Sequence, residues 1–326
     1  MKFCARTDFA DEARVMQLED DTSGELKGVE AEEWEDEHGI RTTYVRITHS
    51  EGAEKLGKPC GRYVTVDISG DVQLDQSLYE AACRVCAKEL SKLLDSVDDG
   101  TVLVVGLGNR NITADAVGPK CVSSVLVTRH LLEYMPEEID SRLRSVCAVT
   151  PGVLGLTGIE TSEIIKALAE KTKPSAIIAI DALCSRRMER ISRTIQFADS
   201  GITPGAGVGN ARMALNRESL GVPVIAIGVP TVIDAATIAG DTIDLIVEDL
   251  KENAKENLPL YKLLSVIVEE DKYSMIKQIL NSDYGDFVVT PKEIDTTVER
   301  LAEIIANAIN IALHKGITLQ DIDKYK

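Results

Sequence analysis

Long hydrophobic runs are absent from this chain of 326 residues. No apolar stretch approaches the roughly 18 residues that a membrane-spanning helix needs. The first residues, Met1 to Asp8, carry charged side chains and lack the apolar core of a secretory signal. We therefore expect a cytoplasmic protein that has no membrane partner.

Basic charge is scarce, with 36 Lys and Arg residues against 53 Asp and Glu residues and a formal net charge of −17. A protein this acidic repels phosphate groups, which disfavours direct binding to nucleic acid. The imbalance is strongest in residues 1–40, which hold 13 acidic and 4 basic residues. We interpret residues 9–39 as an acidic, mobile N-terminal arm or edge region, within which an exposed face explains the acidic run itself better, and residues 40–326 as one α/β domain.

Several familiar catalytic motifs are missing as well. The chain has only four histidines and contains no H-E-x-x-H, no G-x-S-x-G and no paired C-x-x-C zinc motif. The segment from Gly52 to Pro59 resembles a phosphate-binding P-loop, but Pro59 stands where the motif needs Ser or Thr to hold Mg²⁺. Cys83 and Cys86 are the only closely spaced cysteines; we interpret them as core residues, and a redox or zinc role stays open.

The hydrophobic pattern predicts an α/β fold. Residues 102–105, 176–180 and 224–227 are continuous apolar runs, as is typical of parallel strands buried on both faces. Helical patterns separate or follow them at about 118–134, 159–171, 231–253 and 296–314, and a further helix is expected at 77–94. Two alternating runs, 42–48 and 62–68, predict antiparallel strands near one edge. We therefore expect a three-layer α/β fold, with a mostly parallel twisted sheet, helices on both faces and a peripheral β extension.

Two aspartates follow the predicted central strands. Asp115 lies in the loop after residues 102–105, and Asp181 comes directly after residues 176–180. Ligands of open α/β sheets bind in the crevice outside the carboxyl ends of the strands, so both side chains are expected to face one cleft. Two carboxyl groups in one partly dry cleft separate their pKa values, so that one can act as a base and the other as an acid. Each aspartate also fits a simple helix cap or turn.

Glycine-rich loops surround these acids. Backbone amides in such loops could stabilise an oxyanion or bind an extended peptide, and ordinary tight turns explain them equally well. The candidate residues for such a substrate or oxyanion loop are Asn109, Gly155, Gly158, Gly205 and Gly207. The segment 106–109 also leaves open a non-enzymatic nucleotide-binding α/β module, although its glycines do not have dinucleotide-loop spacing.

Seven motifs, in order along the chain, resemble the germination protease (spore protease) family. They are Gly106-Leu107-Gly108-Asn109 with Thr113 to Pro119, Val127 to Leu131, Pro151 to Thr161, Ile180 to Leu183, Gly205 to Asn210, Ile227 to Val232, and Val289 to Asp295. Thr203 departs from the family's Gly-x-His-Pro-Gly loop, in which histidine occupies this position. The resemblance runs from about Arg6 to His314.

The resemblance implies an endopeptidase that degrades small acid-soluble spore proteins during germination. It implies a zymogen in the forespore or spore core, a homotetramer, and self-removal of residues 1–8 by a cut between Asp8 and Phe9, after an acidic residue and before an apolar one. The family's proposed catalytic aspartates match Asp115 and Asp181, without showing which is the base. A mobile terminus is a suitable place for such a cut.

The first of these motifs is also similar to the hydrogenase maturation endopeptidases, which have the phosphorylase/hydrolase-like α/β fold and whose equivalent acids bind metal. A metal-dependent peptidase is therefore an open alternative. No metal ligand or cofactor is assigned from the sequence itself.

Overall fold

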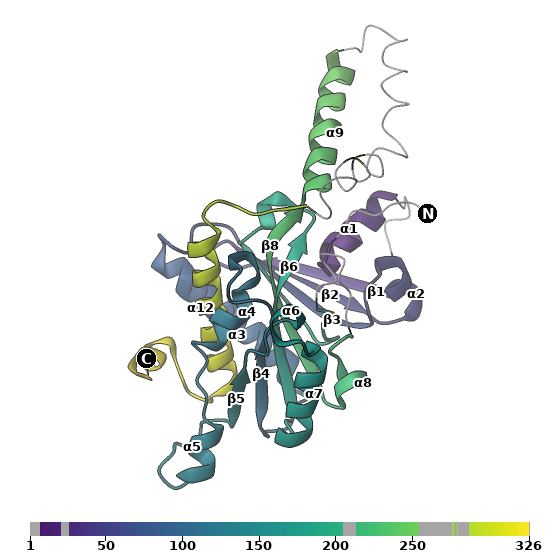
Figure 1. The fold of residues 1–326 in the computed structure, drawn as a ribbon. Helices are drawn as coiled ribbons and strands as arrows, with labels where there is room; N and C mark the ends of the chain where they lie inside the picture. Colours follow the sequence, from purple (N-terminus) through teal and green to yellow (C-terminus); the bar gives the residue numbers. More distant parts are fainter. Residues whose placement is uncertain are drawn as a thin grey trace.

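The computed structural model describes residues 7–20, 26–204, 213–253, 276, 279 and 287–325. Within these residues a nine-stranded sheet has the order β1-β2-β3-β7-β8-β6-β4-β5, and β9 pairs with β8 (Figure 1). The strands are Val29–Glu35 (β1), Ile40–Ile47 (β2), Gly61–Ile68 (β3), Val102–Gly106 (β4), Val146–Val149 (β5), Ala176–Ser185 (β6), Thr194–Ala198 (β7), Val224–Asp234 (β8) and Val288–Val289 (β9).

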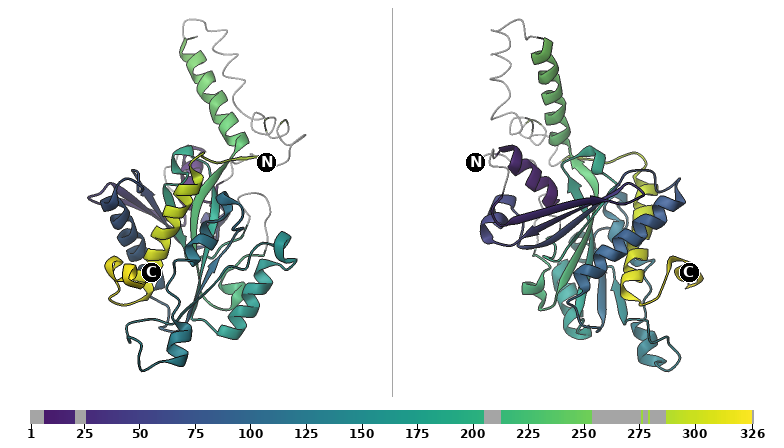
Figure 2. Two further views of the ribbon diagram at one scale, coloured as in Figure 1. Left: turned by 60° about the vertical axis from the view of Figure 1, so that its left-hand side comes forward. Right: turned by 180° about the vertical axis from the view of Figure 1, so that it is seen from behind.

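Helices cover both faces of this sheet, which gives the expected three layers. Their bounds are Ala10–Asp20 (α1), Ser50–Leu56 (α2), Gln76–Leu94 (α3), Val117–Val122 (α4), Arg129–Tyr134 (α5), Leu154–Thr157 (α6), Thr161–Thr172 (α7), Arg217–Leu220 (α8), Ala235–Asn253 (α9), Ile294–Leu313 (α12) and Leu319–Tyr325 (α13), with 3-10 turns at Thr113–Asp115 (η1) and Met188–Arg190 (η2). Helices α3, α4 and α12 pack on one face, and α7 and α8 pack on the other. Helix α9 projects away from the body (Figure 2).

The sheet is mixed, so the expectation of a mostly parallel sheet is only partly right. Strands β8, β6, β4 and β5 are parallel, whereas β1, β2, β3, β7 and β9 pair antiparallel with their neighbours. The parallel strands alternate between the two faces: Val102 and Val104 pack against α3, α4 and α12, and Leu103 and Val105 face α7. Burial on both faces explains their unbroken apolar runs.

Two predicted helices differ from the structure. The helix expected over 118–134 is divided into α4 and α5, because Leu126 N donates to Asn310 Oδ1 at 2.8 Å and Thr128 N donates to the Val146 carbonyl at 2.9 Å. These bonds hold the intervening segment against α12 and β5 instead of letting the helix continue. The helix expected from Thr231 begins only at Ala235, since β8 continues to Asp234.

The acidic region at residues 9–39 is not a mobile arm over its described residues. Residues 10–20 form α1, and residues 29–35 form β1, which is the edge strand paired with β2. Glu30 lies 3.8 Å from Arg46, and Glu33 lies 3.5 Å from Arg41, so basic residues of β2 face the acidic strand. High acidity here reflects an exposed sheet edge, which charged side chains protect from further strand pairing.

The start of α1 is held by Arg190 of η2. Its Nη2 lies 2.5 Å from Asp11 Oδ2 and 3.4 Å from Asp67 Oδ2, and its Nε lies 3.8 Å from Glu12 Oε1. Asp11 and Glu12 are buried. Burial raises the pKa of Asp67, and the Arg190 charge opposes that rise. One guanidinium therefore compensates three carboxyl groups that join α1 to β3.

We expect Arg190→Gln to lower the free energy of unfolding by about 3–5 kcal/mol at pH 8, because it leaves these carboxylates uncompensated. The loss should be smaller at pH 5. Without Arg190 the pKa of Asp67 in the folded protein rises further. When the folded-state pKa of a carboxyl group lies above its unfolded value, the group lowers the stability of the fold as the pH rises above that unfolded value. Urea unfolding at both pH values measures this difference. Arg84→Gln, which breaks the exposed pair with Glu80, is the matched control and should change little. A loss that is equal or larger at pH 5 contradicts the account.

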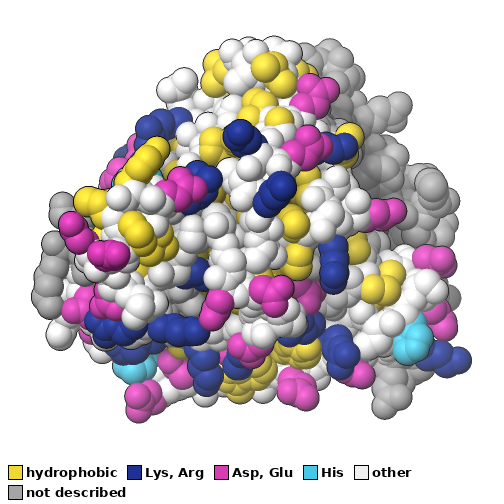
Figure 3. All heavy atoms as spheres, turned by 90° about the horizontal axis from the view of Figure 1, so that it is seen from below, with side chains coloured by type: hydrophobic (Ala, Val, Ile, Leu, Met, Phe, Trp, Pro, Cys, Tyr) yellow, Lys and Arg dark blue, Asp and Glu magenta, His cyan; other side chains and the backbone are white. Residues whose placement is uncertain are grey.

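The lower face of the molecule in Figure 1, where α5 lies, is shown in Figure 3. Basic and acidic side chains alternate over it instead of forming a patch of one sign. Exposed ion pairs of the described surface include Arg142 with Asp140 at 2.5 Å and Lys315 with Asp99 at 3.0 Å. In the part of the chain that the structure describes, we find no helix with the length and apolar character needed to cross a membrane.

Candidate active site

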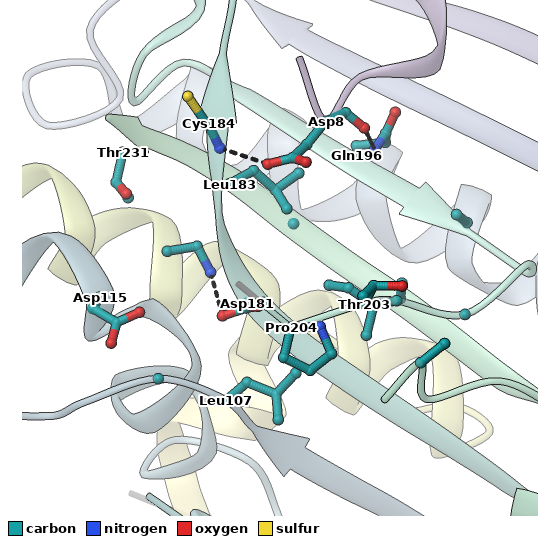
Figure 4. Close-up of a pocket in the computed structure, with 18 of the residues that line it drawn as sticks. Asp8, Leu107, Asp115, Asp181, Leu183, Cys184, Gln196, Thr203, Pro204 and Thr231 are labelled. Carbon is teal, nitrogen blue, oxygen red and sulfur yellow. Dashed lines mark hydrogen bonds between the residues drawn. The ribbon is translucent and has the colours of Figure 1, made fainter. Parts of the chain in front are cut away.

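A cavity of about 550 Å³ opens where β4 ends and β6 and β8 continue (Figure 4). Asp115 and Asp181 both line it, as the sequence predicts, and so does Asp8. Among the described residues that line this cavity, these three carboxyl groups are accompanied by one basic side chain, Lys58. The two predicted aspartates therefore line one acidic cavity.

Asp181 lies inside β6 and not at its end. Strand β4 ends at Gly106, which pairs with Ile180, whereas β6 continues to Ser185 alongside β8. The side chain of Asp181 therefore stands one residue beyond the last rung that β4 covers. It is 7% exposed, and its Oδ1 accepts a hydrogen bond from the Ala182 N–H at 2.9 Å.

Asp115 ends the 3-10 turn η1, on the loop that leaves β4. Its Oδ2 accepts the Asn109 N–H at 2.7 Å, which fixes the carboxyl group against the same loop. Thr231 of β8 ties this turn to the sheet, because its Oγ1 donates to the Ala114 carbonyl at 2.6 Å. Gly108 has a φ of +102°, and a Cβ there would lie 2.1 Å from the Asp115 carbonyl oxygen. Glycine at this position allows the loop to pass directly over Asp115.

Gly118 brings the two aspartates to the same place. It lies in the first turn of α4, three residues after Asp115, and packs directly against the end of β4 and the middle of β6. A Cβ at this position would lie 2.4 Å from the Leu107 carbonyl oxygen and 2.6 Å from the Ile180 carbonyl oxygen. Because Ile180 directly precedes Asp181, this close contact sets the position of η1 relative to β6.

The glycine residues predicted for a substrate or oxyanion loop contribute less to the wall of the cavity than the two aspartates do. Gly155 lies on the short exposed helix α6 and Gly158 caps it, and neither belongs to the cavity wall. Asn109 acts through its backbone N–H on Asp115. Gly205 and Gly207 lie outside the described residues. Residues 200–204, which begin the second of these glycine loops, do line the cavity, together with the loop after β4, the later part of β6 and β8.

Asp8 and Phe9 are bound to the body of the protein, so the expected mobile terminus does not extend to them. Asp8 N donates to the Cys184 carbonyl at 3.2 Å, and the Cys184 N–H donates to Asp8 Oδ2 at 2.9 Å. Gln196 of β7 binds the backbone on both sides of Phe9: its Nε2 donates to the Asp8 carbonyl at 3.2 Å, and its Oε1 accepts from Ala10 N at 3.0 Å. Phe9 is fully buried.

Sequence reasoning did not single out Lys58, Gln196 or Thr231 as site residues. Lys58 lies in the P-loop-like segment, and Thr231 lies in a motif of the family resemblance, so both were visible but had no assigned part in the cavity. Gln196 lies on a short strand without any signal. Each becomes part of the site only when β3, β7 and β8 assemble beside β6.

The described residues contain no group of three or more His, Cys, Asp and Glu side chains placed to hold a metal ion. Cys83 and Cys86 lie on the buried face of α3, in the core, and burial raises the pKa of the Cys83 thiol to about 12. This placement agrees with the interpretation of both cysteines as core residues.

Two carboxyl groups that line one cavity are suited to acid–base chemistry on a water molecule. One carboxylate can take a proton from water, and a protonated partner can donate one to a leaving amine. The cavity is also large enough to admit a stretch of peptide chain. The fold and the site thus describe an α/β protein with the groups required for hydrolysis.

The comparisons with known proteins define the class more closely. The germination protease family model matches residues 6–266 and 248–326. A germination protease of Clostridium perfringens (strain ATCC 13124) is 50% identical over 320 residues, which cover 98% of each chain. That of Priestia megaterium is 41% identical over 362 residues, covering 99% of this chain and 97% of the relative. This chain therefore belongs to the germination protease family and is a peptidase of spore germination.

Among the solved structures that match is the [NiFe] hydrogenase maturation protease HycI from Thermococcus kodakarensis KOD1, with a TM-score of 0.33 and 17% identity over 68% of this chain and 98% of that chain. A likeness this weak carries no argument about the site.

Proposed function

We propose that Asp115 and Asp181 are the acid–base pair with which this peptidase hydrolyses peptide bonds. The observation that supports this assignment is their presence in the wall of one cavity, in a chain of the germination protease family. Asp181 is almost fully buried, and Asp115 is held by the Asn109 N–H, so both carboxyl groups have fixed positions. Fixed positions favour catalysis because the reacting groups need no further ordering.

The proposed substrates are small acid-soluble spore proteins, cut after an acidic residue and before an apolar one. Support comes from the chain itself: the acidic residue Asp8 lies in the cavity wall, and the apolar Phe9 follows it into the core. The same pattern makes the Asp8–Phe9 bond the proposed site of self-processing, which would release residues 1–8. A homotetramer in the forespore belongs to the same proposal and rests on the family resemblance alone.

In this structure the Asp8–Phe9 bond is held away from the proposed catalytic pair. Asp8 pairs with Cys184, which comes three residues after Asp181, or about 10 Å along an extended strand. The Asp8–Phe9 bond is therefore displaced along β6 from the proposed catalytic pair. Cutting it requires this segment to leave Cys184, or to enter the cavity of another copy of the chain.

The proposal is tested by incubating the full-length chain with a purified small acid-soluble spore protein and identifying all new termini by mass spectrometry. We expect substrate fragments that end in Glu or Asp, and a processed enzyme that begins at Phe9. The full-length Asp181→Asn variant is the control for contaminating peptidases and should give neither product. Fragments that end in other residues, or an intact substrate beside a processed enzyme, contradict the proposed specificity.

A further inference from the structure

Lys58 occupies a fixed position at one end of the cavity. It follows α2, where Gly57 has a φ of +62° and Lys58 N donates to the Ala53 carbonyl at 3.1 Å. On its other side, Tyr63 Oη donates to the Pro59 carbonyl at 2.7 Å. Burial raises the pKa of Tyr63 to about 12, which keeps this donor protonated. The loop that carries Lys58 is therefore held at both ends against the cavity.

The charges of the cavity are distributed unevenly. Asp115 and Asp181 make their own part unfavourable for an incoming carboxylate, since like charges repel strongly where water is scarce. Lys58 is the single basic side chain among the described lining residues, and it lies in the part that Asp8 occupies. An acidic substrate side chain is therefore attracted to this end and repelled from the other.

Asp8 shows that a carboxylate fits this place. Its Oδ2 accepts the Cys184 N–H at 2.9 Å, and Lys58 Nζ donates to the carbonyl of the preceding residue, Thr7, at 3.1 Å. Burial lowers the pKa of Lys58, while the negative charges of Asp8 and Glu12 raise it. Glu12 is already bound by the Ser185 hydroxyl and the Arg186 N–H, so Asp8 is the acidic neighbour that would leave with a cut after residue 8.

We propose that Lys58, together with the Cys184 N–H, forms the subsite that selects the acidic side chain of the substrate, and that Asp8 fills this subsite in the unprocessed chain. The inference rests on the proposed cut after an acidic residue. The inference names Lys58 as the residue that makes the enzyme prefer an acidic side chain before the cut. The backbone of Asp8 is itself held by the Cys184 carbonyl and by Gln196, which keeps the Asp8–Phe9 bond displaced from the catalytic pair. In the proposal, a substrate acid binds the same subsite with its backbone free of these two bonds, so that its peptide bond can extend along β6 to Asp181.

The test compares two peptides that carry the sequence around residues 7–10 and differ only in Glu or Gln before the cut. The enzyme in each assay is the full-length chain after processing. The Lys58 variants are processed by added wild-type enzyme. The wild-type enzyme is then removed, and the mass of each processed variant is checked. We expect wild-type kcat/KM to favour the Glu peptide, and Lys58→Gln to reduce that preference about ten- to hundredfold, as expected when the attraction between two opposite charges in a partly buried site is lost. Lys58→Arg should retain most of the preference, and Lys58→Glu should favour a peptide with Lys before the cut.

Lys55→Gln is the matched control, because Lys55 lies on the same segment but is exposed and paired with Glu51 at 3.8 Å. It should keep the wild-type ratio. A preference that Lys58→Gln and Lys58→Glu both retain overturns the assignment of Lys58 and leaves the proposed function intact. A wild-type enzyme that cuts neither peptide counts against the proposed cleavage specificity instead.

Discussion

Replacement of either cavity aspartate should abolish nearly all peptidase activity. We expect Asp115→Asn and Asp181→Asn each to lower kcat by about a hundred- to ten-thousandfold, the contribution typical of a positioned acid or base. Asparagine keeps the size of the side chain and one acceptor oxygen but cannot exchange a proton near neutral pH. The double variant should lose little more than either single variant, because residues that act as one unit are not additive. The measurement is steady-state cleavage of a peptide with Glu before the cut.

The control variant is Asp99→Asn, which removes an exposed aspartate paired with Lys315 far from the cavity. It should retain wild-type kcat. Thermal unfolding of all three single variants separates a loss of chemistry from a loss of fold. Near-normal kcat in a folded Asp115→Asn or Asp181→Asn variant contradicts the proposed pair.

The catalytic candidates were predictable from sequence because they depend on local order along the chain. Each aspartate follows a continuous apolar run, and parallel strands with such runs end at the same edge of a sheet. The exact placement of Asp181 was not predictable. The end of β6 carries on past β4 only because β8 accompanies it, and that pairing joins residues far apart in the sequence.

The structure of the N-terminal region, in contrast, was not predictable from the sequence. Its acidic composition indicates a solvated arm, and composition says nothing of Arg190, which lies almost 180 residues later and compensates Asp11 and Glu12 in the folded protein. Lys58 was hidden for a similar reason. Its segment resembles a phosphate loop in sequence, but its place at the cavity depends on the pairing of β3 with β7 and on Asp8 reaching Cys184.

Gly118→Ala should disrupt both stability and catalysis, because the added methyl group has no space. Its Cβ would lie 2.4 Å from the Leu107 carbonyl oxygen, and 2.6 Å from both the Leu107 nitrogen and the Ile180 carbonyl oxygen. All three are backbone atoms at the end of β4 and in the middle of β6, so α4 and the turn that carries Asp115 must move away from β6. We expect the free energy of unfolding to fall by about 3 kcal/mol, as for a severe overpacking change. A displacement of Asp115 by about 1 Å relative to Asp181 should lower kcat about a hundredfold.

Urea unfolding and peptide cleavage, measured at a temperature where the variant is fully folded, separate these two effects. Gly155→Ala serves as the control for stability, since a Cβ there meets nothing within 4 Å. Its free energy of unfolding should stay the same or rise slightly, as alanine favours helix over glycine. If Gly118→Ala were as stable and as active as the wild type, the contact between α4 and the middle of β6 would not be what positions the two aspartates. The combined loss is expected because one backbone contact both closes the core at this edge and brings Asp115 to the cavity that Asp181 shares.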